Sequence, residues 1–265
     1  MCHIIVCMKI IIDPEAPFSV FKIDKESQKP VPPSGMPPVF SPFDENGLEA
    51  ALRIKDGNPD CRITLLSMGK SLPKAILQKA LAVGADDIIA VEDPEFENLD
   101  PFNTARVLVK AIEKIGEYDL IFTGRQAADW DAGIVWAGIA ELLNIPSITI
   151  ARRVELLDEK VVVERCVTDG IEFLESELPA LVTFTNEGGE LRNVSLSALM
   201  KVRRQEIPKW SATDVGFEKE DMMAMKELYE PDLAVTECSM ISGESFEEKG
   251  RNLAKRFVEE GIIER

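Results

Sequence analysis

The chain is short of the side chains that most catalytic and metal sites require. Among its 265 residues there is one histidine, His3, which falls in an apolar, β-prone run that predicts a strand. Serine and cysteine triads and histidine-based metal sites are therefore nearly excluded, and we expect His3 to be structural. We assign no catalytic residue and no metal ligand. The shortage favours a binding or carrier protein over a hydrolase.

The cysteines follow no pattern that would join them. Their number is odd and no two form a C-x-x-C pair; they are Cys2, Cys7, Cys61, Cys166 and Cys238. This favours reduced thiols in a cytoplasmic protein over a disulfide framework or a zinc site. No apolar run approaches membrane-spanning length, and Lys9 interrupts the first one. We therefore expect neither membrane insertion nor a secretion signal.

Basic charge is also scarce. There are 30 Lys and Arg residues against 47 Asp and Glu residues, which gives a formal net charge of −17. Such a chain repels nucleic acid and anionic lipid, so we expect no nucleic-acid partner. The surplus acid suits a basic partner, although it is more often a solvated surface. At this length, with 45% hydrophobic residues, the chain can bury a full core.

The most informative stretch runs from Asp119 to Pro146. Its short apolar run predicts a buried parallel strand, Gly124 allows a tight turn, and apolar residues at helical spacing predict a helix that ends at Asn144. Asp129 or Asp131 is a candidate to cap that helix. Free amides at such a helix start favour phosphate, but an ordinary connection without a ligand has the same pattern.

Strands and helices alternate in the first part of the chain. Apolar runs predict strands over 3–8, 61–68, 87–91 and 120–122, and amphipathic patterns predict helices over 42–56, 71–83 and around 105–115. Ser41 and Ser71 are cap candidates for the first two helices. Prolines between Pro30 and Pro38 predict an extended loop, and residues 19–24 a strand of a small hairpin. The alternation predicts an α/β fold, a Rossmann-like parallel sheet with helices on both faces.

The second part of the chain has a different pattern. Runs over 147–150, 154–157, 161–167, 171–174 and 180–185, with turns between several of them, predict antiparallel edge hairpins. From Glu206 the strong apolar periodicity is lost, and an amphipathic helix is predicted over 246–263. We therefore predict a nucleotide-binding α/β domain over 1–205 and a C-terminal arm over 206–265 that docks on a partner subunit.

Five stretches resemble motifs of the electron-transfer flavoprotein β subunits. They are Val6–Lys9 with Asp13, Ser41–Glu45 with Leu48–Arg53, Gln78–Asp86, Gly124–Asp131 with Ala140–Pro146, and Arg165–Thr183. Each stretch alone is a weak signal. Five such stretches in the right order over most of the chain are specific, so the chain resembles this family.

The resemblance implies a heterodimer with an α subunit that carries the redox FAD. Such a complex carries electrons between a dehydrogenase of the acyl-CoA type and a further acceptor such as a quinone reductase. The β subunit itself performs no bond-making catalysis. It is expected to have its own nucleotide pocket, which holds AMP in simple carriers and a second FAD in electron-bifurcating members.

Carried over residue by residue, the resemblance places this pocket at the carboxyl ends of three strands. The implied lining residues are Cys7, Ser41, Ser67, Met68, Gly124, Gln126, Asp129, Asp131, Gly133, Ile134 and Val135. Amides that follow Asp131 would bind the phosphate, and loops at Met8 and Met68 would flank the base. Ser41 stands where the family has Asn, and Ile134 where it has Gln. AMP, a second FAD and no ligand all stay open.

The family also docks dehydrogenases through a loop with a leucine anchor. Ser195–Lys201 resembles that loop, with Leu196 at the anchor position and Lys201 on its basic rim. A leucine that starts the buried face of a surface helix would give the same pattern.

One other class of protein shares the predicted sheet. A stand-alone regulator of the universal-stress-protein type would bind ATP or AMP through a glycine-rich phosphate loop late in the chain. Gly188-Gly189 is the nearest match and is too short. The electron-carrier interpretation is therefore preferred, with the bifurcating form as its alternative.

Overall fold

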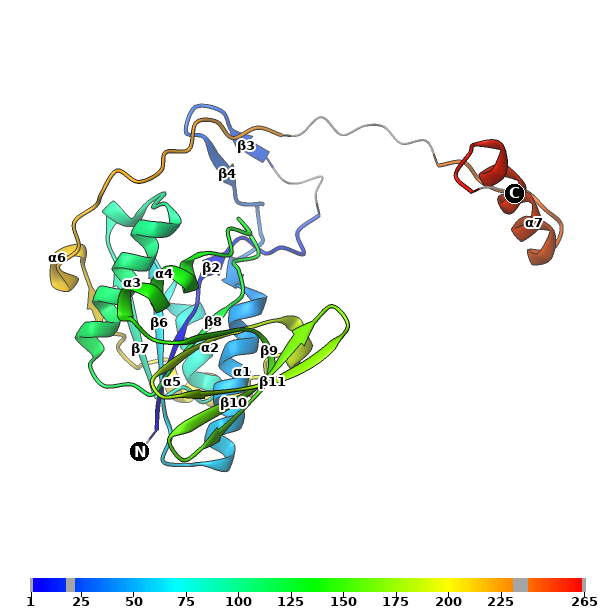
Figure 1. Cartoon of the computed structure of the whole chain (residues 1–265). Coiled ribbons are helices and arrows are strands. Elements are labelled where there is room, and N and C mark those ends of the chain that lie inside the picture. The colour runs from blue at the N-terminus through cyan, green and yellow to red at the C-terminus, as the bar shows by residue number, and fades with distance from the viewer. Residues whose placement is uncertain (1, 18–21, 231–237, 264–265) are drawn as a thin grey trace. The chain divides into compact units, whose positions relative to one another are not determined.

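A nine-stranded sheet organises the larger of two units into which the chain divides, Met1–Leu228 and Tyr229–Arg265. The structure is a computed structural model that describes residues 2–17, 22–230 and 238–263 (Figure 1). The strand order is β11-β10-β9-β12-β8-β1-β6-β7-β13. The α/β fold predicted from the sequence is confirmed.

The centre of the sheet is parallel. Its strands are β1 (His3–Cys7), β6 (Arg62–Gly69), β7 (Asp87–Glu92), β8 (Leu120–Gly124) and β12 (Ala180–Phe184), with the short β13 (Lys209–Trp210) added beside β7. Most of their residues are apolar and buried, as is typical of parallel strands in a sheet with helices on both faces. The predicted strands in this region are confirmed.

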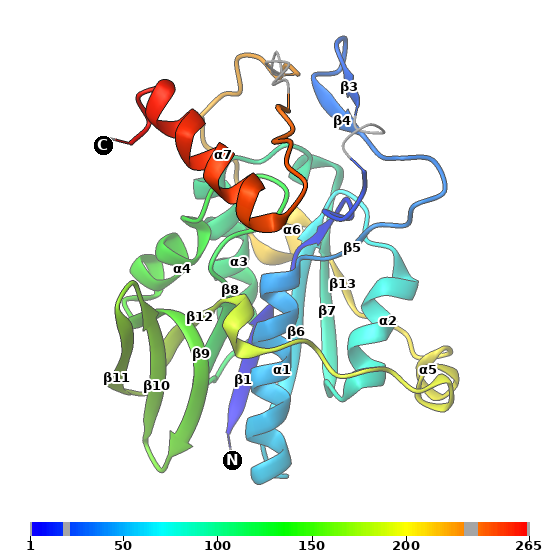
Figure 2. The same cartoon turned by 90° about the vertical axis from the view of Figure 1, so that its right-hand side faces the viewer.

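Helices cover both faces (Figure 2). One core cluster joins the sheet to α1 (Pro42–Gly57) and α2 (Lys74–Val83), and α5 (Leu196–Val202) contacts α2. The other cluster joins the sheet to α3 (Pro101–Ile115), α4 (Val135–Leu143) and α6 (Ala212–Val215). Phe122 and Phe184 pack edge to face on neighbouring strands, with ring centroids 4.7 Å apart. No helix among the described residues is long and apolar enough to cross a bilayer.

The antiparallel part of the sheet is only partly as predicted. β9 (Ser147–Leu157), β10 (Lys160–Val167) and β11 (Gly170–Glu177) form the expected edge hairpins. Residues 147–157 are a single strand, however, in which Ile150 has a φ of 61° and the register shifts instead of the strand ending. β12 instead lies between β8 and β9 and is parallel to both. All of its residues are buried, as in the other central strands.

The remaining elements are short. They are β2 (Ile10–Ile11) paired with β5 (Val39–Phe40), β3 (Lys22–Asp24) paired with β4 (Lys29–Val31), and the 3₁₀ turns Pro94–Phe96 and Asn186–Gly188. The extended-loop prediction is wrong at Pro30, which lies in β4; a two-stranded edge tolerates the missing N–H. The start of the predicted hairpin strand at residues 19–21 lies outside the described residues.

Two of the predicted helix caps are not used. α2 begins at Lys74 with Pro73 at its N-cap, so Ser71 does not cap it. The proline disfavours a helical conformation at Leu72, which keeps the helix from starting earlier. Ser41 does occupy the N-cap position of α1, but its side chain makes no capping hydrogen bond. The predicted helix end at Gly84 is confirmed, with a φ of 129° at that glycine.

The residues after Glu206 divide between the two units. Residues up to Leu228 belong with the sheet: β13 and α6 lie there, and the Glu220 N–H donates to Asn103 Oδ1 at 3.1 Å. The smaller unit contains α7 (Phe246–Glu259), the predicted amphipathic helix. The division by contacts thus falls further along the chain than Glu206, and docking of this segment on a partner stays a prediction.

Candidate functional site

The parallel strands end together at one edge of the sheet. β1 has β6 on one side and β8 on the other, so the chain's crossovers run in opposite directions from this point. In open α/β sheets, the carboxyl edge at such a switch point is where ligands bind. Cys7, Ser67, Met68 and Gly124, four of the predicted site residues, lie at the carboxyl ends of these three strands. The structure therefore brings together residues that are far apart in the sequence.

Gly124 is a point of close backbone approach. A Cβ built on it would lie 2.5 Å from Asp44 Oδ1 and 2.8 Å from Phe43 Cβ. The glycine is needed here for space, since its φ is not in the left-handed region. Its N–H donates to Asp44 Oδ1 at 2.8 Å. The end of β8 is thus pressed against the first turn of α1.

Asp44 holds two strand ends at once. Its second oxygen, Oδ2, accepts the backbone N–H of Lys9 at 2.8 Å, just after β1. The residue is buried. Burial raises the pKa of Asp44 from 3.8 to about 7, although the two backbone N–H donors and the Lys9 charge act in the opposite direction. The carboxyl group is therefore poised to change charge near neutral pH.

Ser41 joins the same network. Its N–H donates to the Lys9 carbonyl at 2.8 Å, and its Oγ accepts the Ala128 N–H at 3.4 Å. The hydroxyl is thus used between segments instead of as a helix cap. Ser41 therefore ties the start of α1 to the residues that follow β1 and β8.

The prediction that Asp129 or Asp131 caps α4 is wrong. The N-cap is Ile134, five residues after Asp129 and three after Asp131. Asp131 has a φ of 49° and Gly133 a φ of 63°, and this left-handed backbone delays the helix. Asp129 instead pairs with Lys9 Nζ at 2.8 Å, and Asp131 Oδ1 accepts from Gln126 Nε2 at 2.9 Å.

The start of α4 has amides free of intrahelical bonds. The first such bond joins the Gly138 N–H to the Ile134 carbonyl at 3.1 Å, so the N–H groups of Val135, Trp136 and Ala137 precede the ladder. No side chain caps them. Trp130 and Ile134 beside them are exposed, by 51% and 42%. This end can hold an anion, and it presents apolar surface next to that position.

Polar atoms without a protein partner gather near the same edge. The side chain of Ser67 is 1% exposed, and its Oγ has no hydrogen-bond partner among the described residues. Arg125 Nε is also buried and unpartnered there, while its guanidinium lies 4.8 Å from the centre of the Phe43 ring. Buried polar atoms normally have partners, so a ligand with polar groups fits this edge. Cys7 is buried, and burial raises the pKa of its thiol.

The predicted docking residues lie elsewhere. Leu196 and Lys201 are on α5, which is held to α2 where Gln78 Nε2 donates to the Arg203 carbonyl at 2.9 Å. Leu196 is 78% exposed, so the alternative of a buried helix face is not supported. Figure 2 shows α5 beyond α2, away from the start of α1. The docking residues and the carboxyl edge are thus separate places.

The Gly188-Gly189 turn does not offer a phosphate loop. Its N–H groups donate to the carbonyls of Thr185 and Asn186 at 3.0 and 3.1 Å. Its carbonyls accept from Arg53 at 2.8 Å and from Asn46 at 2.5 Å. Because the amides are already used, the turn is a structural link to α1.

Two surface hollows lie apart from the candidate site residues. The larger, about 600 Å³, is lined by the last turns of α1 and by β9, and contains Arg53, Arg152 and Arg153. All three arginines are paired with glutamates. The smaller, about 360 Å³, is lined by residues that include Arg62, Lys114 and Trp210. Neither hollow contains a predicted nucleotide residue.

Sequence reasoning missed Asp44, Lys9 and Arg125. By its local pattern, Asp44 is an acid in the first turn of a helix, where the helix dipole favours an acid. Its burial and its two N–H donors depend on strands more than thirty residues away. Its place between Phe43 and Glu45 in a motif of the resemblance was the one available signal.

Comparison with known proteins adds an independent result. The model of the electron transfer flavoprotein domain matches residues 35–215. The Megasphaera elsdenii electron transfer flavoprotein subunit beta is 37% identical over 220 residues, covering 81% of this chain and 80% of that protein. The Acetobacterium woodii caffeyl-CoA reductase-Etf complex subunit CarD is 34% identical over 218 residues, covering 82% and 81%. Protein FixA of Sinorhizobium fredii is 34% identical over 223 residues, covering 82% and 76%.

Proposed function

This chain belongs to the electron transfer flavoprotein family as a β-type subunit, and from that premise we propose that it pairs with an α-type subunit whose FAD carries the electrons. The complex then transfers electrons between a dehydrogenase and a further acceptor. When bound, FAD supplies the redox chemistry. This chain's own residues bind and orient, and they provide surfaces for partners.

We further propose that the carboxyl edge binds an adenine nucleotide. The observation that carries this is the buried, unpartnered Ser67 Oγ at the end of β6, beside strand ends that Asp44 holds in place. The N–H groups of Val135, Trp136 and Ala137 are the candidate phosphate donors. Met8, just after β1, and Met68, near the end of β6, would flank the base. Ser41 holds this set together through Ala128 and Lys9.

AMP is the first candidate for this edge, and a second FAD is the other. The exposed Trp130 and Ile134 suit the second candidate as well, because a flavin ring, which is joined to the phosphates through a ribityl chain, packs on apolar surface. The relative CarD is named as part of a caffeyl-CoA reductase complex, which suits a reductase as one partner. One AMP per complex would mean a simple carrier, and two FAD a bifurcating form.

The α5 surface is proposed as the dehydrogenase contact. Leu196 and Met200 are exposed, and Lys201 lies in the last turn of the same helix. An exposed leucine with a basic neighbour suits a transient interface with an acidic rim. Replacing Leu196 with Ala should slow electron transfer to or from the dehydrogenase and leave the flavin content unchanged. Equal loss of flavin would contradict a docking role.

The smaller unit is proposed as the arm that contacts the α-type subunit. Phe246, Leu253 and Phe257 of α7 are all exposed among the described residues. Such an apolar face is normally covered by another surface. Leu253→Glu together with Phe257→Glu should weaken the heterodimer. An unchanged dissociation constant for the two subunits would contradict this.

Co-expression with the α-type subunit tests the main proposal. We expect a heterodimer that retains FAD through purification. A stable heterodimer without flavin would contradict electron transfer by this complex. A monomer of this chain that binds ATP alone would instead support the stand-alone regulator.

A further inference from the structure

Three segments meet at the carboxyl edge and are joined by Asp44 and Ser41. The segment after β1 contributes Lys9, the start of α1 contributes Ser41 and Asp44, and the end of β8 continues through Gly124 to Asp129. Asp44 accepts one N–H from each strand end, and Ser41 bonds to Lys9 and to Ala128. These segments contain Ser41, Gly124, Gln126 and Asp129, four of the predicted pocket residues. Their spacing therefore sets the shape of the proposed site.

The two hydrogen bonds of Asp44 favour its ionised form. Each carboxylate oxygen accepts a backbone N–H at 2.8 Å, so both oxygens act as acceptors. In the protonated acid one oxygen carries a hydrogen and is a much weaker acceptor than a carboxylate oxygen. The hydrogen bond to that oxygen would then be weakened or lost. Protonation of Asp44 should thus release either the end of β1 or the end of β8.

We propose that Asp44 is a positioning residue for the adenine nucleotide, and that its ionised carboxylate holds the ends of β1 and β8 in the arrangement that binds this ligand. This inference rests on the proposed nucleotide site. Asp44 is not assigned a contact with the ligand; it acts through the backbone of Lys9 and Gly124. Nucleotide binding should accordingly weaken as the pH falls through the range in which Asp44 is protonated.

The charged groups around Asp44 come from each packed segment. Lys9 lies just after β1, and its charge favours the ionised form, whereas Asp129 after β8 opposes it. Cys7 on β1 is a buried thiol whose pKa is raised by burial and by Asp44. The single histidine, His3, lies at the opposite end of β1, where its ring meets the Glu117 carbonyl and Thr64. A change near neutral pH at the carboxyl edge therefore cannot come from a histidine of this chain.

Binding of radiolabelled AMP to the heterodimer at several pH values tests the inference. The wild type should bind AMP about tenfold more weakly at about pH 5.5 than at about pH 8.5, as expected for one lost hydrogen bond to a charged group. Asp44→Asn should bind AMP about tenfold more weakly than the wild type at about pH 8.5 and about equally at about pH 5.5, because its amide can accept only one of the two N–H groups at any pH. Glu45→Gln, in the same helical turn, is the matched control and should follow the wild type; Glu45 contacts Lys79 and no strand end.

The shape of the pH profile separates positioning from a general structural role. AMP's own phosphate protonates near pH 6, but it does so equally for every variant. The ratio of wild-type to Asp44→Asn affinity should therefore fall towards one as the pH falls. A constant ratio, or equal affinities at all pH values, would overturn the inference and leave the site intact. Wild-type protein that binds no AMP and retains no adenine nucleotide beyond one FAD would overturn the proposed site itself.

A second measurement needs no Asp44 variant. In the wild-type heterodimer, hydrogen exchange at the Lys9 and Gly124 amides reports directly on the hydrogen bonds that these amides donate to Asp44. After correction for intrinsic exchange, protection at one or both amides should fall about tenfold between about pH 8 and about pH 5.5. Unchanged protection at both amides would overturn the inference.

Discussion

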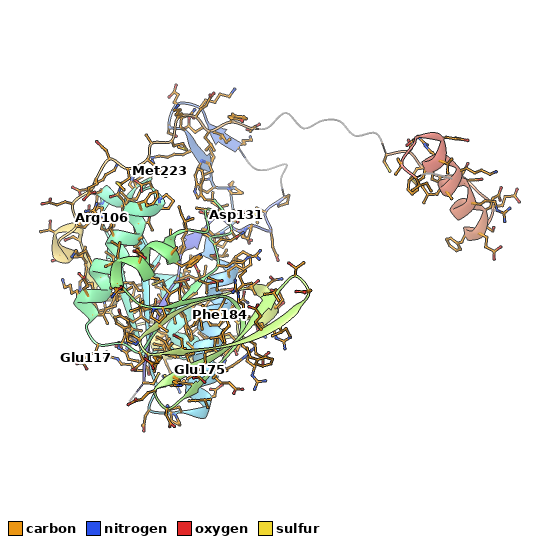
Figure 3. The ribbon with its side chains drawn as sticks, in the orientation of Figure 1. Arg106, Glu117, Asp131, Glu175, Phe184 and Met223 are labelled. Atoms are coloured by element: carbon orange, nitrogen blue, oxygen red, sulfur yellow. The ribbon has the colours of Figure 1, made fainter. Side chains whose placement is uncertain are left out.

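The two ends of the parallel sheet satisfy their polar groups in different ways. Figure 3 shows Glu117 at one end of the larger unit, before β8, and Asp131 at the other, after β8. At the amino end, the His3 N–H donates to Asp119 at 2.7 Å and the Ile63 N–H to Asp86 at 2.8 Å. At the amino end, the chain's own carboxylates therefore satisfy these two strand N–H groups.

The carboxyl end is left incomplete. Among the described residues, the buried side-chain atoms without partners are Asn46 Oδ1, Ser67 Oγ, Arg125 Nε and Arg165 Nε. Ser67 lies near the carboxyl end of β6, Arg125 directly follows β8, and the free amides of α4 lie after β8 as well. One end of the sheet thus supports the fold, and the other retains polar groups for something outside the chain. Changes at the carboxyl end should therefore affect nucleotide binding, whereas changes at the amino end should affect stability alone.

Gly124→Ala should have the largest effect, at the carboxyl end. Its Cβ would overlap Asp44 Oδ1 and Phe43 Cβ, and neither neighbour can move freely because both belong to α1. We expect a loss of about 3 kcal/mol in the free energy of unfolding, together with loss of the bound adenine nucleotide. Urea unfolding and nucleotide content measure the two effects. Gly57→Ala, where a Cβ meets nothing within 4 Å, is the control.

Asp44 should give stability and binding opposite pH trends. Since its folded pKa of about 7 lies above 3.8, the folded chain binds an extra proton between these values. The stability that this group contributes is present at low pH and is lost as the pH rises to about 7. Relative to Asp44→Asn, the wild type should lose about 2 kcal/mol in unfolding free energy between about pH 5.5 and about pH 8.5. A difference that grows with pH would contradict this assignment.

Asp119→Ala should affect only the amino end. Removal of this carboxylate leaves the His3 N–H without its 2.7 Å acceptor. We expect a loss of about 1.5 kcal/mol in unfolding free energy, with the nucleotide content of the surviving heterodimer unchanged. Thermal unfolding and acid release of nucleotide measure these quantities. Nucleotide loss from this variant would break the distinction between the two ends.

Ser67→Ala should have the smallest effect on stability and the opposite sign. Its Oγ is buried without a protein partner, so removal of the hydroxyl relieves an unpaired polar group. We expect a gain of up to about 1 kcal/mol in unfolding free energy and about a fivefold weaker affinity for AMP. If AMP binding is unaffected, the hydroxyl does not face the nucleotide.

Much of this fold can be predicted from local patterns. Short apolar runs indicate β1, β6 and β8. Gly84 and Asn144 indicate where two helices end. Each of these signals depends only on residues close to it in the sequence. The caps predicted at Ser71 and at Asp129 or Asp131 fail for local reasons too, since Pro73 and the positive φ of Asp131 move the helix starts. Parallel pairing of β12 was missed, although its continuous apolar run is typical of a strand buried on both faces.

The site is less predictable, because its key contacts join distant segments. The resemblance supplies Gly124 and Ser67 as candidates, but nothing local indicates that Ser67 Oγ lacks a partner. The burial of Asp44 follows from how α1 packs against the ends of β1 and β8. Such contacts become visible only once the chain is folded.

Acid release of nucleotides from the wild-type heterodimer tests most directly whether the carboxyl edge of this chain binds an adenine nucleotide. AMP and FAD would be quantified per pair of subunits. We expect an adenine nucleotide in addition to the one FAD of the α-type subunit: AMP in a simple carrier, or a second FAD in a bifurcating form. One FAD and nothing else would contradict it, because the incomplete carboxyl end would then have no ligand.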